Sequence, residues 1–160
     1  ARPGRVPRLM LMSAAGVAFP PNDFARAIAA GEYPYAVRNR ADLHRQLSLV
    51  FTDPPWVPWP ADLALARRRA ADLPFELEVV SSLHHGDDAF LLQSRLGDVQ
   101  APTLLLWCRD DRVIDVGSVD IFARGLAESR QVIIEGCGHM PLMAEPRLVA
   151  DSLRWFLGPG

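Results

Sequence analysis

Lysine is absent from this sequence, so all 17 basic side chains among its 160 residues are arginines. They are offset by 19 acidic residues, which gives a formal net charge of -2. Proteins that bind nucleic acid or an anionic membrane surface carry an excess of basic charge for that purpose. The near-neutral balance gives no electrostatic case for either partner, and we expect no nucleic-acid ligand.

Long apolar runs and cysteines are also scarce. No stretch approaches the roughly 20 apolar residues that a membrane-spanning helix needs, so we expect no membrane span. The apolar run at 9–12 is too short for the hydrophobic region of a signal peptide. The two cysteines, Cys108 and Cys137, cannot form the framework of a disulfide scaffold, and they suit a reducing compartment. We therefore expect two free thiols and a cytoplasmic protein.

The composition that remains, 49% hydrophobic and 22% charged, is ordinary for a soluble globular domain with a core. Three short apolar runs are typical of buried strands, and a helical pattern follows each of the last two. The strands are predicted at 9–13, 103–107 and 131–135, and the helices at 118–126, with Ser118 as N-cap, and 146–157, with Pro146 in its first position. This alternation predicts an α/β fold with three parallel strands in sequential order and crossover helices.

Between the first two strands, the residues form a largely helical insertion. Helices are predicted at 23–30 before Gly31, after a cap at Asn39, and at 61–73, 75–83 and 88–96. Four prolines and two tryptophans exclude regular structure from 51–60. The chain thus divides into a core strand and loop at 1–17, a helical cap-like insertion at 18–98 and a core α/β segment at 99–160.

Acidic residues and a histidine follow the second and third strands. Asp110, Asp111 and Asp115 come after 103–107, and His139 comes after 131–135. Since neighbouring strands lie ~4.8 Å apart and their carboxyl ends share one edge, the two loops can meet. A carboxylate that orients a histidine is the supporting half of a Ser-His-Asp relay. A solvated surface pair is the alternative reading of these residues alone.

Longer motifs favour the relay. The segment PTLLLWCRDDRVI at 102–114, followed by GCGHMPLMAEP at 136–146 and WFL at 155–157, resembles the C-terminal part of the α/β-hydrolase family. The start of the chain resembles the strand after the family's nucleophile helix. The segments at 29–38 and 49–55 resemble the helical cap of monoacylglycerol-lipase-like esterases.

The resemblance implies roles for single residues. Asp111 is the triad acid and His139 the triad base, while Asp110 and Asp115 are solvated or structural. The other histidines, His44, His84 and His85, are expected to be surface or cap contacts.

The sequence departs from the family in two places. Cys108 stands where the family usually has glycine, and a positive φ there would strain it. The Gly-x-Ser-x-Gly nucleophile elbow is absent, and Ser13, which follows a strand, lacks its glycines. The family places the elbow and the oxyanion loop in an N-terminal half of the core that would precede Ala1. The chain therefore looks like the C-terminal part of a hydrolase.

The resemblance implies ester hydrolysis through an acyl-enzyme, with no metal and no cofactor. The expected substrate is a small ester with an apolar acyl chain. Its pocket would be walled by Phe51, Trp56, Trp59 and Met140, although ordinary packing between cap helices also explains the aromatic residues. The alternatives are hydrolysis of C–C bonds, epoxides or haloalkanes on the same fold, or a truncated, non-catalytic remnant.

Overall fold

A parallel sheet of three strands forms the centre of the computed structural model, which describes residues 5–84 and 90–158. The strands β1 (Leu9–Met12), β2 (Thr103–Cys108) and β3 (Ser129–Ile134) are ordered β1-β2-β3. Both pairings are parallel, with Leu9 opposite Thr103 and Thr103 opposite Ser129. The predicted fold class and strand order are confirmed. The structure starts β3 two residues earlier than predicted and ends β2 one residue later.

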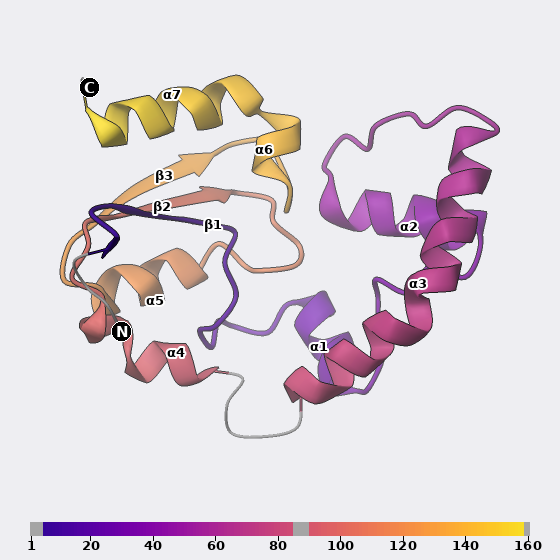
Figure 1. The fold of residues 1–160 in the computed structure, drawn as a ribbon, viewed down its shortest axis with the longest axis horizontal. Coiled ribbons are helices and arrows are strands. Elements are labelled where there is room, and N and C mark those ends of the chain that lie inside the picture. The colour runs from indigo at the N-terminus through magenta and orange to yellow at the C-terminus, as the bar shows by residue number, and fades with distance from the viewer. Residues whose placement is uncertain (1–4, 85–89, 159–160) are drawn as a thin grey trace.

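Two helices cover opposite faces of this sheet (Figure 1). Helix α5 (Ser118–Gly125) connects β2 to β3 on one face, and α7 (Pro146–Leu157) follows β3 and lies on the other. Every residue of β2 is buried. Its side chains alternate between the two faces, so Leu105 and Trp107 pack with Phe122 of α5, and Leu106 packs with Val149 of α7. Each fully buried side chain of this size contributes ~1.5–3 kcal/mol through its removal from water.

Among the described residues between β1 and β2, three helices form the cap. They are α1 (Asp23–Ala29), α2 (Arg40–Val50) and α3 (Ala61–His84). Asn39 caps α2 by accepting from the N–H of Asp42, as predicted. Gly31, at φ +80°, adopts the left-handed conformation that ends a helix, which suits its place just after α1. The cap stands beside the carboxyl ends of β2 and β3, where parallel sheets carry their functional groups (Figure 1).

Two helix predictions were wrong. Helix α3 continues through Pro74, where we expected a break between 73 and 75. Pro74 is exposed, so the carbonyl that loses its helical N–H partner can bind water instead. Ser118 is not the N-cap of α5. Gly117 holds that position, and the Ser118 hydroxyl is buried with no hydrogen-bond partner among the described residues.

The segment before β2 also differs from the predicted helix at 88–96, the start of which lies outside the described residues. The structure has a short α4 (Leu91–Ser94) followed by the 3-10 helix η3 (Leu96–Asp98). A further short helix, α6 (Pro141–Ala144), was not predicted and directly follows the His139 loop. In the part of the chain that the structure describes, none of the helices is both long enough and apolar enough to cross a bilayer.

Candidate active site

Asp111 lies on the loop after β2, with its side chain fully buried. Its Oδ1 accepts hydrogen bonds from the backbone N–H groups of Val113 and Ile114, both at 2.9 Å. The Trp107 indole donates to the carbonyl of Ile114 at 3.0 Å, which fastens the far end of the loop to the core. The loop therefore holds its buried carboxylate in a fixed orientation.

His139 lies on the loop after β3 and faces this carboxylate. Its Nδ1 is 3.0 Å from Oδ2 of Asp111, and 21% of the side chain is exposed. The predicted contact is confirmed. As predicted, Asp111 rather than Asp110 or Asp115 makes this contact. Asp110 is exposed, and the carboxylate of Asp115 accepts a hydrogen bond from the N–H of Gly117 at 2.8 Å. The arrangement provides an oriented imidazole backed by a buried carboxylate, as acid–base catalysis requires.

Cys108 and Cys137 form a disulfide, so the prediction of two free thiols was wrong. They follow adjacent strands, and their Cα atoms are 5.1 Å apart, within the range that a disulfide bridges. The strain expected at Cys108 is absent, since Ser13 is the non-glycine residue with positive φ within 5–84 and 90–158. Disulfides are typical of oxidising compartments. The disulfide therefore argues against the reducing compartment on which the cytoplasmic location was predicted, and that location stays a prediction.

Ser13 follows β1 with φ +43°. Its hydroxyl is buried and has no hydrogen-bond partner among the described residues. A nucleophile elbow is a strand-turn-helix, with the serine at the turn. Here a loop runs from Ser13 to Asn22 before α1 begins, so Ser13 does not stand in an elbow.

The predicted pocket residues fall into two groups. Phe51 is buried and lines a cavity of about 270 Å³ beside the His139 loop, together with Cys137. Met140 is half-buried next to His139. Trp56 and Trp59 are 84% and 73% exposed, so the structure does not bring them into this group. The acyl-pocket role of all four residues stays a prediction.

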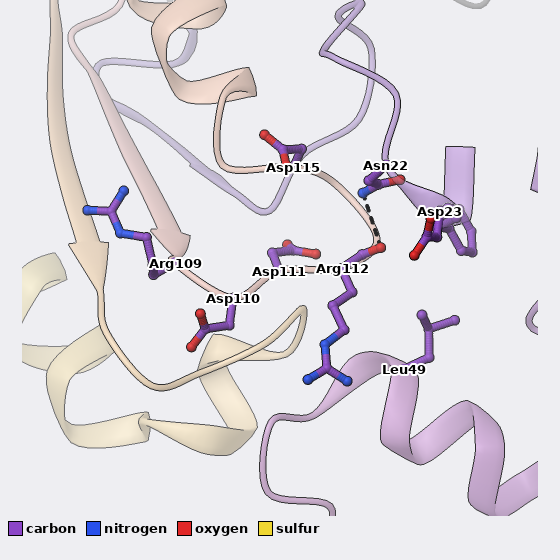
Figure 2. Close-up of a pocket in the computed structure, with 9 residues that line it drawn as sticks. Asn22, Asp23, Leu49, Arg109, Asp110, Asp111, Arg112 and Asp115 are labelled. Carbon is purple, nitrogen blue, oxygen red and sulfur yellow. Dashed lines mark hydrogen bonds between the residues drawn. The ribbon is translucent and has the colours of Figure 1, made fainter. Parts of the chain in front are cut away.

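A second cavity, of about 420 Å³, opens on the acid loop, which is the loop after β2 that carries Asp111. Its lining consists mainly of charged side chains (Figure 2). The Asn22 amide donates to the carbonyl of Arg112 at 3.1 Å. The Arg112 guanidinium extends toward α2 and donates to the carbonyl of Ser48 at 3.2 Å. Neither Asn22 nor Arg112 was predicted as a site residue. The helix-capping position of Asn22 before Asp23 was the available signal.

Tyr35, in the cap, is influenced by the acid. Burial raises the pKa of the Tyr35 phenol, and the negative charge of Asp111 raises it further. The phenol is therefore neutral at physiological pH.

The other histidines lie away from the acid and the base in the sequence. Nε2 of His44 is 3.5 Å from Oδ2 of Asp62, so His44 is a cap contact, as expected. His85 and the side chain of His84 lie outside the described residues.

Comparison with known proteins assigns the family. A model of the alpha/beta hydrolase family matches residues 2–152. The chain belongs to the alpha/beta hydrolase family. This alpha/beta hydrolase is 33% identical to the monoacylglycerol lipase ABHD6 of Bos taurus over 81 residues, which are 51% of this chain and 23% of that protein. It is 38% identical over 65 residues to 2-hydroxy-6-oxononadienedioate/2-hydroxy-6-oxononatrienedioate hydrolase 2 of Pseudomonas putida, covering 38% of this chain and 23% of that protein.

A solved structure matches nearly the whole chain. The crystal structure of a membrane phospholipase A, described as a bacterial virulence factor, superposes with a TM-score of 0.90 at 32% identity. The match covers 98% of this alpha/beta hydrolase chain and 50% of that protein. The chain thus spans about half the length of this solved relative. The similarity to monoacylglycerol-lipase-like proteins that the cap motifs indicated is confirmed.

Proposed function

We propose that this chain supplies the acid, the base and the cap of a serine hydrolase that cleaves carboxylic esters. The observation that carries the proposal is the hydrogen bond between Nδ1 of His139 and the buried carboxylate of Asp111. A carboxylate in this position holds the imidazole in the tautomer whose Nε2 accepts a proton, and it stabilises the imidazolium that forms.

The proposed reaction proceeds through an acyl-enzyme. A serine from a segment of the hydrolase core that precedes Ala1 attacks the ester carbonyl, and Nε2 of His139 takes its proton. The imidazolium then returns that proton to the departing alcohol, and water releases the acid by the same route. The serine is assigned to a preceding segment because no Gly-x-Ser-x-Gly occurs in the sequence.

The proposed substrates are monoacylglycerol-like esters. Two relatives, named as a monoacylglycerol lipase and a membrane phospholipase A, support an ester with an apolar acyl chain. The position of Phe51 beside the His139 loop supports an apolar wall on that side.

The test uses the complete protein that contains this chain, assayed with p-nitrophenyl esters and monoacylglycerols. We expect turnover that His139→Ala abolishes and that His44→Ala, a histidine change within the cap, preserves. No turnover in the complete protein would favour the non-catalytic remnant. The 160-residue chain alone should show only background hydrolysis. Turnover by it that depends on His139 would contradict the missing nucleophile and direct the search to Ser13.

Hydrolysis of C–C bonds is the second candidate. The identity to the Pseudomonas putida 2-hydroxy-6-oxononadienedioate hydrolase favours it. A parallel assay with a 2-hydroxy-6-oxo-dienoate separates the two activities. Turnover of this compound together with inertness toward esters would replace the first candidate by the second.

A further inference from the structure

The disulfide links Cys108, at the end of β2 and just before the loop that carries Asp111 (the acid loop), to Cys137 in the loop that carries His139 (the base loop). Cys108 precedes Asp111 by three residues, and Cys137 precedes His139 by two. Both cysteines are buried, at 0% and 1% exposure. The bridge therefore joins the end of β2 covalently to the base loop, within three residues of each functional side chain.

The bridge holds the chain after β3 against the end of β2, beyond the last paired residues of the two strands. The β2–β3 ladder finishes where Cys108 pairs with Ile134, so Cys137 lies past it. Gly136, at φ +72°, turns the chain back toward β2. Two backbone hydrogen bonds accompany the bridge. The N–H of Arg109 donates to the carbonyl of Ile134 at 2.8 Å, and the N–H of Asp110 donates to the carbonyl of Cys137 at 3.2 Å. Without the disulfide, the second of these hydrogen bonds, the turn at Gly136 and the exposed ion pair between Arg109 and Glu135 remain to hold the loop that carries His139 against the loop that carries Asp111.

We propose that the Cys108–Cys137 disulfide positions His139 against Asp111, so that their hydrogen bond depends on the oxidation state of the two cysteines. The catalytic meaning of this dependence rests on the proposed function, while the geometric dependence does not. The disulfide is a positioning element, since it would act on His139 through the loop that carries it.

Opening of the bridge is a two-electron reduction. One thiolate of a dithiol such as dithiothreitol attacks one sulfur of the bridge and forms a mixed disulfide with that cysteine. The second thiol of the dithiol then attacks the mixed disulfide and releases that cysteine as well. The dithiol becomes a cyclic disulfide, and Cys108 and Cys137 receive two electrons and two protons as thiols.

The experiment follows the Nδ1 proton of His139 by proton NMR in the complete protein that contains this chain. A histidine proton bonded to a carboxylate resonates far downfield of the amides, and its loss in Asp111→Asn assigns it. Spectra are compared for the oxidised chain, the dithiothreitol-reduced chain and the Cys108→Ala/Cys137→Ala variant. Amide resonances of β2 and β3 report whether each form keeps its sheet. Thiol titration in denaturant confirms the state of the bridge.

We expect the downfield resonance in the oxidised chain and its loss or exchange broadening in the other two forms while the sheet amides persist. The resonance unchanged after the bridge is opened would overturn the inference, and so would two free thiols in a chain purified without reductant. Loss of the sheet in both opened forms would also overturn it, because the bridge would then be a general staple. Absence of the resonance from the oxidised chain would instead contradict the acid–base pair of the proposed function.

Discussion

His139 binds Oδ2 of Asp111, while Oδ1 of the same carboxylate accepts two backbone hydrogen bonds from its own loop. One side chain thus fixes the loop and orients the imidazole. These two roles can be separated by mutation, because an amide keeps a carbonyl oxygen for the loop but cannot act as a carboxylate toward Nδ1.

We expect Asp111→Asn to preserve the fold and to lower kcat of the complete hydrolase by roughly four orders of magnitude, as the corresponding change does in serine proteases. Asp111→Ala should in addition destabilise the chain, since the buried N–H group of Val113 and the partly buried N–H group of Ile114 lose their acceptor, at about 1–3 kcal/mol for a fully buried donor. Urea unfolding of both variants measures the difference. Equal stability of the two would show that Oδ1 does not hold the loop.

The sheet and the contact between acid and base were predictable because strong local signals mark them. The apolar runs predicted three buried strands; all three form, although β2 is fully buried while β1 is half-buried and β3 partly exposed. Parallel strands bring their following loops to one edge. The motif favours Asp111 over Asp110, and the structure agrees because the buried Asp111 contacts Nδ1 of His139 while Asp110 is exposed.

Other features depend on tertiary contacts that no local pattern encodes. Composition argued against pairing of Cys108 with Cys137, yet the turn at Gly136 brings the two together. The continuity of α3 through Pro74 depends on the exposure of that residue. The contact of Arg112 with Ser48 joins segments 64 residues apart in the chain.

Gly138 allows the base loop to approach the cap. A Cβ at this position would lie 2.6 Å from the carbonyl oxygen of Val50, a backbone atom at the end of α2. Gly138→Ala must therefore displace either the end of α2 or the loop that carries His139. We expect it to destabilise the chain by about 1–3 kcal/mol in urea unfolding, the usual cost of overpacking.

Gly97→Ala is the matched control, since a Cβ there meets nothing within 4 Å. Its unfolding midpoint should stay close to that of the parent chain. If Gly138→Ala were equally harmless, the packing of the base loop on α2 would not be a tight one.

A buried carboxylate in the cap should make stability depend on pH. Burial alone raises the pKa of Asp62, but hydrogen bonds from Arg40 and from the backbone N–H of Leu63 outweigh it. The net result is a pKa below the ordinary value for aspartate. A lowered native pKa stabilises the fold at pH values above the unfolded pKa, and this contribution is lost as the pH falls through the native pKa.

The urea midpoint, measured from pH 7 down to pH 3, should therefore fall with pH. Asp62→Asn should lower the midpoint most at pH 7, and its curve should approach that of the parent chain in acid. Asp72→Asn on the same helix is the control, because its partner Arg68 is 3.9 Å away and both side chains are exposed. A constant offset between Asp62→Asn and the parent at every pH would contradict this assignment.

Arg112 ties the acid loop to the same end of α2 that Gly138 contacts. Its guanidinium donates to the carbonyl of Ser48, in the last turn of α2, where helix carbonyls lack intrahelical partners and cations are favoured by about 0.3–1 kcal/mol. Arg112→Ala should loosen that turn while leaving global unfolding nearly unchanged.

Hydrogen exchange of the amides in the last turn of α2 measures this loosening directly. We expect faster exchange there in Arg112→Ala and a smaller increase in Arg112→Lys, which keeps the charge but not the planar fork of donors. Arg109→Ala is the control from the same loop, because Arg109 pairs with Glu135. Arg112 follows Asp111 directly in the chain. Faster exchange at the end of α2 in Arg112→Ala would therefore show that this side chain couples the cap to the loop that carries Asp111. Identical exchange in Arg112→Ala and Arg109→Ala would mean that the guanidinium does not hold the cap.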